Sequence, residues 1–334
     1  MADQTAQLDD GATDVASDDA RVHGDRWRVY TEDWDPSYGV PAAFDVDSSE
    51  DVVKIESGEG PVQASRVAAE PLAFIDGCRR VELSLWAENG VTGERVPGLA
   101  GVYAVGAVTV TPGAPPAYSG VRRGRVVIWG GGRSGDLVGR HGYRWASHST
   151  NADDPDQLVA HLQDRMRRAE GDLALAAAAL GWTVVLDGPL NRIRTLHELV
   201  TGYVKTHRRQ LLPLPDHAAV PMLELGARTR LYAVGQDRFT CYVRVGWPQP
   251  GGSPWSGIAR LDFPAVAGVD AVADRATQLA ALLPQYAGVA HRDPRAPVNL
   301  TPVKNLENHL THLLGRAEHA TRAARAAAMA GGIE

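Results

Sequence analysis

Two short stretches, Leu72-Ala-Phe-Ile-Asp-Gly77 and Trp182-Thr-Val-Val-Leu-Asp-Gly188, decide how this sequence folds. Each is an apolar run that ends in an Asp-Gly pair, which predicts a buried strand followed by a tight connection. After the first pair, apolar and polar residues alternate over positions 81–87, so we expect a second strand there. If the two apolar strands are neighbours, Asp76 and Asp187 meet at one edge of a sheet, where open α/β sheets bind ligands.

A long amphipathic helix is predicted between these two stretches. Asp153-Asp154-Pro155 has the acids and the proline typical of a helix start, and Gly181 ends the helical pattern. The apolar residues recur at steps of three and four: Leu158, Leu162, Met166, Ala169, Leu173, Ala176 and Leu180. Glu170 lies on or beside this stripe. A carboxylate that faces a sheet is costly unless a cation or hydrogen bonds compensate its charge.

The order of the remaining predicted elements indicates the fold class. Further strands are predicted at 101–111, 125–129, 229–234, 239–245 and 257–263, and further helices at 195–212, 269–283 and 306–328. A hairpin and a strand, then alternating helices and strands, is the order of an RNase H-like core. We therefore expect an α/β protein with an RNase H-like mixed sheet flanked by helices, extra β-strands and a helical C-terminus.

The three acids, Asp76, Glu170 and Asp187, are candidate metal ligands. Converging carboxylates need a cation, and hard oxygen ligands suit Mg²⁺ or Mn²⁺. The two cysteines, Cys78 and Cys241, are too few for a thiolate metal site. A structural explanation stands beside this one. Asp-Gly is a common turn signal, and Glu170 at the edge of its stripe would simply reach water.

The charge of the chain is unevenly distributed. The 334 residues have a net charge of −6, which argues against a nucleic-acid partner. Residues 1–60, however, hold 16 of the 40 acids and four of the 34 basic residues, so their net charge is −12 and that of residues 61–334 is +6. The average therefore describes neither part, and the body of the protein is mildly basic.

We predict three regions: an acidic, largely disordered or arm-like leader over residues 1–60, a globular domain over 61–316 and a C-terminal helical tail over 317–334. No run of about 18 apolar residues is present and the N-terminus is acidic, so we expect neither a transmembrane helix nor a signal peptide. A cytoplasmic protein without a membrane partner is the expectation.

Several motifs follow one another along the chain: Phe74-Ile-Asp-Gly77, Val185-Leu-Asp-Gly-Pro-Leu190, Gly202-Tyr-Val-Lys205, His291-Arg-Asp-Pro-Arg-Ala-Pro-Val-Asn-Leu300, Leu306-Glu307 and Leu313-Leu-Gly315. In this order they resemble the bacterial branch of the NurA nuclease family, over about residues 66–316. The resemblance implies that the globular domain is an RNase H-like, metal-dependent nuclease acting on DNA ends. It further implies a homodimer that works with the hexameric ATPase translocase HerA.

The resemblance also implies roles for individual residues. The family's metal-binding acids correspond to Asp76, Glu170 and Asp187, and its late histidine corresponds to His291, with Asp293 as a competing candidate. A tyrosine that the family uses corresponds to Tyr286. Cys78 and Val298 stand where the family has serine and glutamine. Two Mn²⁺ or Mg²⁺ ions would be bound by this set, with His291 or Asp293 completing it.

Basic residues near these motifs are candidates for contacts with DNA. The chain has only three lysines among its 34 basic residues, so Lys205 on the helix predicted after the second apolar strand stands out as a phosphate contact. Arg208 and Arg295 are further candidates, although an ordinary surface or ion-pairing role explains each arginine equally well.

Activity and role remain open between several alternatives. Similarity to the family favours a 5′–3′ exonuclease with single-strand endonuclease activity, in DNA end processing or defence against phage. The alternatives are a non-catalytic or weakly catalytic DNA-binding subunit of a HerA-type complex, and an RNase H-like enzyme that acts on RNA.

Overall fold

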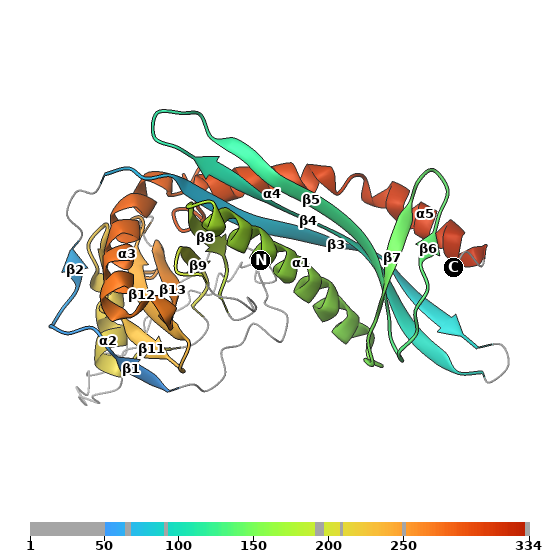
Figure 1. Cartoon of the computed structure of the whole chain (residues 1–334), viewed down its shortest axis with the longest axis horizontal. Helices are drawn as coiled ribbons and strands as arrows, with labels where there is room; N and C mark the ends of the chain where they lie inside the picture. Colours follow the sequence, from blue (N-terminus) through green and yellow to red (C-terminus); the bar gives the residue numbers. More distant parts are fainter. Residues whose placement is uncertain are drawn as a thin grey trace, which may run out of the picture.

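The computed structural model describes residues 51–63, 68–89, 93–190, 197–207, 210–248 and 252–330. Most of the expected leader, residues 1–50, and the expected DNA contact at Arg208 lie outside these ranges. In the described part of the chain, a long mixed sheet runs through the molecule and helices cover both of its faces (Figure 1).

The middle of the sheet has the strand order β5-β4-β3-β8-β9. β3 (Leu72–Glu88), β4 (Arg95–Val110) and β5 (Ala117–Trp129) are antiparallel neighbours, whereas β8 (Thr183–Asp187) and β9 (Val200–Val204) run parallel to β3. The first apolar run is completely buried at the start of β3, because strands flank it on both edges and helices cover both faces. The expected α/β fold class, with a mixed sheet flanked by helices, is confirmed.

The sheet continues past both ends of this middle part. Beyond β9 lie β13 (Ile258–Pro264), β12 (Arg238–Arg244), β11 (Tyr232–Val234) and β1 (Val52–Lys54). β10 (Ala227–Arg228) also pairs with β12, and β2 (Val62–Gln63) pairs with β10. Beyond β5 lie β7 (Arg144–Ser149) and β6 (Leu137–Val138). Of these, β11, β12 and β13 correspond to predicted strands, whereas the short strands β1, β2, β6, β7 and β10 were not predicted.

One face of the sheet is covered by α1 (Pro155–Ala179), the long predicted helix. Its first turn is capped by Asp154, whose side chain accepts a hydrogen bond from Asp156 N. The first part of the predicted stripe, from Leu158 to Leu173, faces the sheet, and Leu173 packs in one cluster with Ala73 and Ile75 of β3. The odd-numbered residues at the start of β3 therefore face α1. The end of the stripe was predicted wrongly, because Ala176 and Leu180 are exposed.

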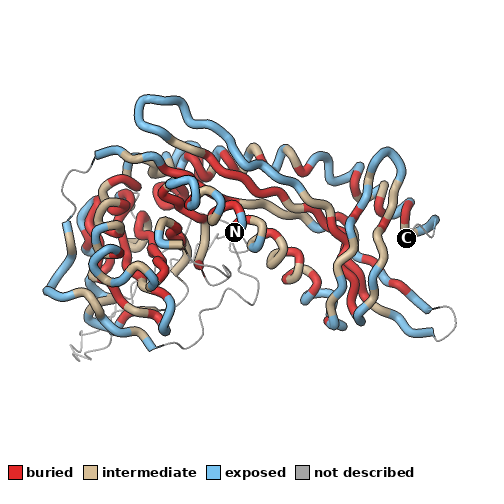
Figure 2. Tube along the Cα trace, viewed as in Figure 1, coloured by how far each residue is buried: buried red, intermediate tan, exposed pale blue. Residues whose placement is uncertain are grey.

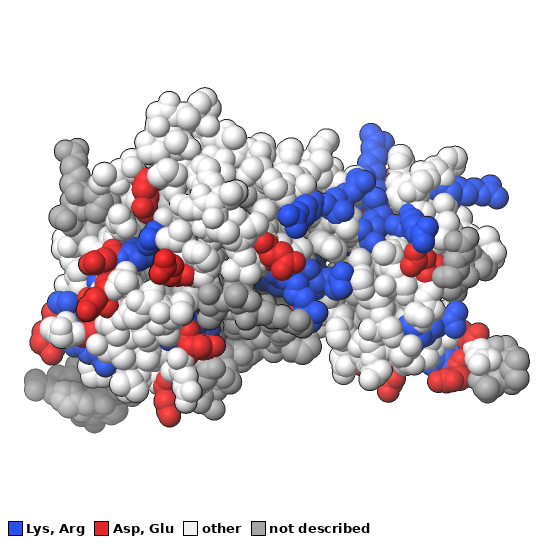
Figure 3. Space-filling model, viewed as in Figure 1, with Lys and Arg blue, Asp and Glu red and all other residues white. Residues whose placement is uncertain are grey.

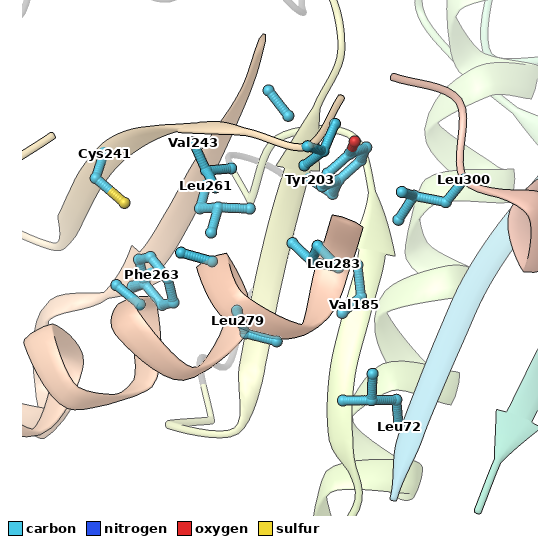
Figure 4. Close-up of a cluster of buried hydrophobic side chains, with 14 of the residues drawn as sticks. Leu72, Val185, Tyr203, Cys241, Val243, Leu261, Phe263, Leu279, Leu283 and Leu300 are labelled. Atoms are coloured by element: carbon cyan, nitrogen blue, oxygen red, sulfur yellow. The ribbon is translucent and has the colours of Figure 1, made fainter. Parts of the chain in front are cut away.

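The remaining helices have these bounds: α2 (Leu214–Ala219), α3 (Val269–Leu282), α4 (Thr301–Leu313), α5 (Ala317–Met329), and the 3₁₀ turns η2 (Val220–Met222), η3 (Ala265–Ala267) and η4 (Leu283–Tyr286). α3 and α4 pack on the face opposite α1. Buried residues of both helices form a large core cluster with Leu72, Val185 and Tyr203 (Figure 4). Burial is concentrated along the strands and the inner sides of the helices (Figure 2).

The tight connection expected after the first apolar run is wrong. β3 passes through Asp76 and Gly77 as one continuous strand, because β4 pairs with it without a break from Leu72 to Val81. Asp76 therefore lies within a strand and not at its end, while Asp187 does end β8 as expected. An Asp-Gly pair permits a turn, but the unbroken pairing with β4 overrides that local preference.

The helix expected over 195–212 is also wrong. The described residues of this segment contain strand β9, and all five of its residues are buried. Three of them are the β-branched residues Val200, Thr201 and Val204, and a fourth is Tyr203, a composition that favours a strand on a covered sheet. Lys205 consequently follows a strand and does not lie on a helix.

Candidate functional site

Asp76 and Asp187 are neighbours on adjacent strands. The parallel pairing of β3 with β8 ends at Ile75 and Leu186, and the two aspartates occupy the next position on each strand. Phe74 and Val185, two residues earlier, share one core cluster. Because strand side chains alternate between faces, the two carboxylates point to the same face, on strands about 4.8 Å apart.

The environment of Asp76 disfavours its charge. The side chain is buried, and its Oδ1 accepts a hydrogen bond of 2.8 Å from Gly77 N. Burial raises the pKa of Asp76 well above its ordinary value, and the neighbouring charges of Asp187 and then Glu170 raise it further. The Lys205 ammonium acts in the opposite direction and lowers this pKa. Asp76 is therefore a buried acid that a positive charge would stabilise in its ionised form.

Glu170 approaches this group from the other side of the sheet. It is completely buried on α1, and a Cβ atom placed on Gly77 would lie 2.5 Å from Glu170 Oε1. Gly77 faces α1, so Glu170 lies against the backbone of β3 directly beside Asp76 but on the opposite face. Only glycine leaves room for the Glu170 carboxylate at this point of the strand.

Arg167 connects Glu170 to the end of β8. Its Nη1 donates a hydrogen bond of 3.0 Å to Glu170 Oε2 and another to the main-chain oxygen of Asp187. Gly188, which follows with φ = 103°, leaves space for the Arg167 guanidinium, because a Cβ atom there would overlap it. Sequence reasoning missed this residue, although its place one turn before Glu170 was a possible signal.

Lys205 is the cation closest to the paired aspartates. Its Nζ lies 2.7 Å from Asp187 Oδ2 and 2.9 Å from Asn299 Oδ1. Asn299 Nδ2 in turn donates to Asp293 Oδ2 over 2.5 Å, and Asp293 Oδ1 accepts from Arg295 N over 2.8 Å. A continuous set of hydrogen bonds thus joins Asp187 to the loop before α4. Asn299 was not singled out from the sequence as a functional residue.

The two late candidates occupy different environments. Asp293 is buried and belongs to the network through Asn299. His291 is exposed, and its Nε2 accepts a hydrogen bond of 3.2 Å from Arg292 Nε. The described contacts therefore bring Asp293 towards Asp187 and leave His291 on the surface of the loop.

The remaining predicted residues lie around this loop. Arg295 is half-buried, and its charge lowers the pKa of Tyr203, which burial and Asp187 raise. Tyr203 OH donates a hydrogen bond of 2.7 Å to the main-chain oxygen of Val298. The Tyr286 ring packs edge-on against Phe74, with 5.1 Å between their centroids. Tyr286 therefore packs against the hydrophobic core beside the loop before α4.

The donor atoms at this site fit a divalent cation in their chemistry. Within the described residues, Asp187 Oδ1 is buried and has no hydrogen-bond partner, so one oxygen of this carboxylate is available. Over the same residues, no three His, Cys, Asp or Glu side chains are already arranged as ligands of one ion. Two features explain this. Lys205 is paired with Asp187 and Arg167 with Glu170, and Glu170 lies on the other face of β3.

The fold and site define an α/β protein of RNase H-like strand order with a buried group of carboxylates. No protein-family model matches the chain, and no curated protein matches its sequence. Among solved structures, the chain is similar to the crystal structure of the NurA nuclease from Sulfolobus solfataricus. The TM-score is 0.43 and the identity 11%, over 76% of this chain and 86% of that one. In the described part of the chain, no helix has the length and apolar character needed to cross a membrane.

Proposed function

We propose that this chain is a divalent-metal-dependent nuclease that hydrolyses phosphodiester bonds in DNA. The observation that carries the proposal is the adjacency of Asp76 and Asp187 on one face of the sheet, where the charge of Asp187 raises the pKa of the buried Asp76. A structural pair of acids would be expected to have two cationic partners. Here Lys205 is bonded to Asp187, while the described hydrogen bond of the Asp76 side chain comes from a backbone amide.

Asp76 and Asp187 would hold Mn²⁺ or Mg²⁺ from one face, and Glu170 would contribute from the side of α1. One or two bound ions supply an activated water and stabilise the leaving oxygen. Arg167 keeps the Glu170 carboxylate against Gly77, and Lys205 orients Asp187. His291 or Asp293 would complete the ligand set, as the resemblance to the family implies.

Basic side chains support a polyanionic substrate. Arginine and lysine side chains gather on the face shown in Figure 3, over α1, β5 and β7. Arg122 of β5 and Arg168 of α1 are exposed. Such a surface attracts a phosphate backbone without reading its sequence. Lys205 and Arg295 are the proposed contacts nearer to the carboxylates, and Arg208, which lies outside the described residues, is a further proposed contact.

The finer aspects of the proposal rest on the resemblance of the sequence motifs to the NurA family. They are DNA rather than RNA as substrate, 5′–3′ exonuclease and single-strand endonuclease activity, a homodimer, and a HerA-type hexameric ATPase as partner in DNA end processing or defence against phage. The modest positive charge of residues 61–334 agrees with DNA that is delivered by a translocating partner.

The test compares DNA degradation by the wild-type chain and by Asp76→Asn. The substrates are matched single- and double-stranded DNA and RNA of one sequence, labelled at either end, with Mn²⁺, Mg²⁺ or EDTA. We expect Mn²⁺-dependent loss of DNA with the wild type and none with Asp76→Asn. Glu88→Gln is the matched control, because Glu88 is an exposed acid on the same strand. Unimpaired cleavage by Asp76→Asn contradicts the proposal.

One observation favours the alternative of a non-catalytic subunit. In the described residues the carboxylates are held by Lys205 and Arg167 and form no ready metal site. A chain that binds DNA and the ATPase but cleaves neither DNA nor RNA with any divalent ion would support this alternative.

A further inference from the structure

Lys205 lies between two acceptors in a nearly closed environment. Its side chain is 8% exposed, and its Nζ contacts Asp187 Oδ2 on one side and Asn299 Oδ1 on the other. An ammonium group has three donors, so two of them are used by these contacts. The ammonium is therefore bound to the carboxylate that the nuclease proposal assigns to a metal ion.

The amide of Asn299 has a fixed orientation. Its Nδ2 donates to Asp293 Oδ2, and both residues are buried. Asp293 is held in turn by the Arg295 backbone amide on its other oxygen. Because a carboxylate only accepts, the amide nitrogen must face Asp293 and the amide oxygen must face Lys205. Asn299 thus presents a permanent second acceptor to the ammonium, and Asp293 is the residue that keeps it there.

The two carboxylate oxygens of Asp187 have different environments. Oδ2 binds the Lys205 ammonium, whereas Oδ1 is buried with no hydrogen-bond partner in the described part of the structure. The same ammonium lowers the pKa of Asp76, so its charge acts on both aspartates. A divalent ion bound to these carboxylates would repel an ammonium a few ångströms away, because both are cations in a weakly screened site.

We propose that Lys205 is a built-in counter-ion which leaves Asp187 when a divalent cation binds there, and that Asn299, positioned by Asp293, retains its hydrogen bond to the released ammonium. This inference rests on the proposed metal-dependent function and adds a regulatory feature to it. The occupancy of the site by metal is set by competition with a side chain of the same protein. Asn299 and Asp293 are positioning residues that make the exchange easier.

The test measures Mn²⁺ binding without DNA, from the electron paramagnetic resonance signal of free Mn²⁺ titrated with the full chain. We expect Lys205→Met to bind Mn²⁺ about tenfold more tightly, since one charged hydrogen bond no longer competes. Lys205→Gln should act in the same direction, and Lys205→Arg, which keeps the charge, should stay within about threefold of wild type. Far-ultraviolet circular dichroism and thermal melting show whether each variant is folded.

Asn299 provides the decisive second measurement. Asn299→Leu removes the alternative acceptor, so it should weaken Mn²⁺ binding by about threefold. In the double variant Lys205→Met/Asn299→Leu this effect should vanish, because no ammonium needs to be accommodated. A merely structural role of Asn299 would weaken binding equally in both backgrounds, and that result overturns the inference.

The remaining outcomes separate this inference from the nuclease proposal. Unchanged or weaker Mn²⁺ binding by folded Lys205→Met and Lys205→Gln overturns the inference while leaving the nuclease proposal intact. No Mn²⁺ binding by any of these chains overturns both. The expected order of affinities in a chain that leaves DNA intact supports the inference and contradicts the nuclease proposal alone.

Discussion

Strand β3 carries two buried carboxylates, six residues apart, in opposite electrostatic environments. Glu82 is surrounded by compensating groups: Trp145 Nε1 donates to it over 2.7 Å, Arg80 Nη2 donates over 3.2 Å, and Arg125 Nε forms an ion pair at 3.5 Å. Asp76 has the Gly77 backbone amide and two further carboxylates nearby. Both residues are acids on the same strand, so the difference lies entirely in their neighbours.

The comparison distinguishes Glu82, whose charge stabilises the fold, from Asp76, whose charge would be stabilised by a bound cation. Around Glu82 opposite charges and an indole donor compensate the burial, and Arg80 and Arg125 also donate to the main-chain oxygen of Leu314 after α4. Removing that carboxylate leaves the buried Trp145 indole N–H without its described acceptor and two guanidinium groups without their counter-charge. Around Asp76 like charges add to the cost of burial, so removing its charge relieves the folded state.

The largest expected effect is at Glu82, whose buried charge is compensated by its neighbours. Glu82→Ala should lower the free energy of unfolding by about 3–5 kcal/mol, because it leaves the buried Trp145 N–H without its acceptor and two arginines without their counter-charge. Urea denaturation measures the change. Glu88→Ala is the control, since its pair with Arg95 is exposed and should contribute less than about 1 kcal/mol. A loss below about 1 kcal/mol for Glu82→Ala would remove the distinction between the two sites.

The second effect is the stabilisation of the folded protein by a metal ion bound at Asp76. Binding of Mn²⁺ to the folded state alone should stabilise the wild type by about 2.7 kcal/mol at a concentration 100 times the dissociation constant. Asp76→Asn should lose most of this stabilisation, whereas Glu88→Gln should keep it. Thermal melting with Mn²⁺ and with EDTA measures both. Equal stabilisation of the wild type and Asp76→Asn would mean that the ion binds elsewhere.

Asp187 should behave differently from Asp76 although the two are neighbours. Asp187→Asn leaves the Lys205 ammonium without its charged partner, so we expect a cost of about 1–2 kcal/mol in urea denaturation. Combining it with Lys205→Met should recover part of this loss, because no unpaired cation remains. No recovery in the double variant would show that the ion pair is not the source of the cost.

The smallest effect is a gain in stability for Asp76→Asn, and it depends on pH. Between the ordinary pKa of 3.8 and the raised pKa of the folded state, the unfolded chain has released a proton that the folded chain retains. Rising pH over this interval therefore favours unfolding of the wild type. In EDTA we expect Asp76→Asn to lose less stability than the wild type as the pH rises from 4. At pH 8 we expect it to be about 1 kcal/mol more stable than the wild type. Parallel stability profiles for the two chains would contradict the raised pKa.

Much of the fold could be predicted from local patterns. The stripe from Leu158 to Leu173 and its Asp-Pro start predict α1 correctly, and the apolar run before Asp187 predicts β8. The continuity of β3 and the strand at β9 could not be predicted in this way. Both depend on neighbours far along the chain: β4 pairs through Asp76 and Gly77, and β8 and β13 flank β9.

For the candidate site, the sequence predicts the acids better than their partners. Apolar runs before Asp76 and Asp187 indicate charges held at a buried sheet, and the helical period points to Glu170. The hydrogen bond between Lys205 and Asn299 joins residues 94 positions apart, so no local spacing reveals it. The metal-ligand and DNA-binding roles assigned from the sequence remain predictions.

The continuous strand β3 also determines when the site can form during synthesis. Its antiparallel partner β4 follows it directly, whereas its parallel partner β8 begins only at Thr183. A ribosome-bound chain that ends before Thr183 has Asp76 on an open strand edge, and one that ends before Asn299 lacks the second acceptor of Lys205. Because chains fold from the N-terminus as they emerge, the acidic group is completed late, and a nascent chain is without its full constellation until the segment around Asn299 has been made.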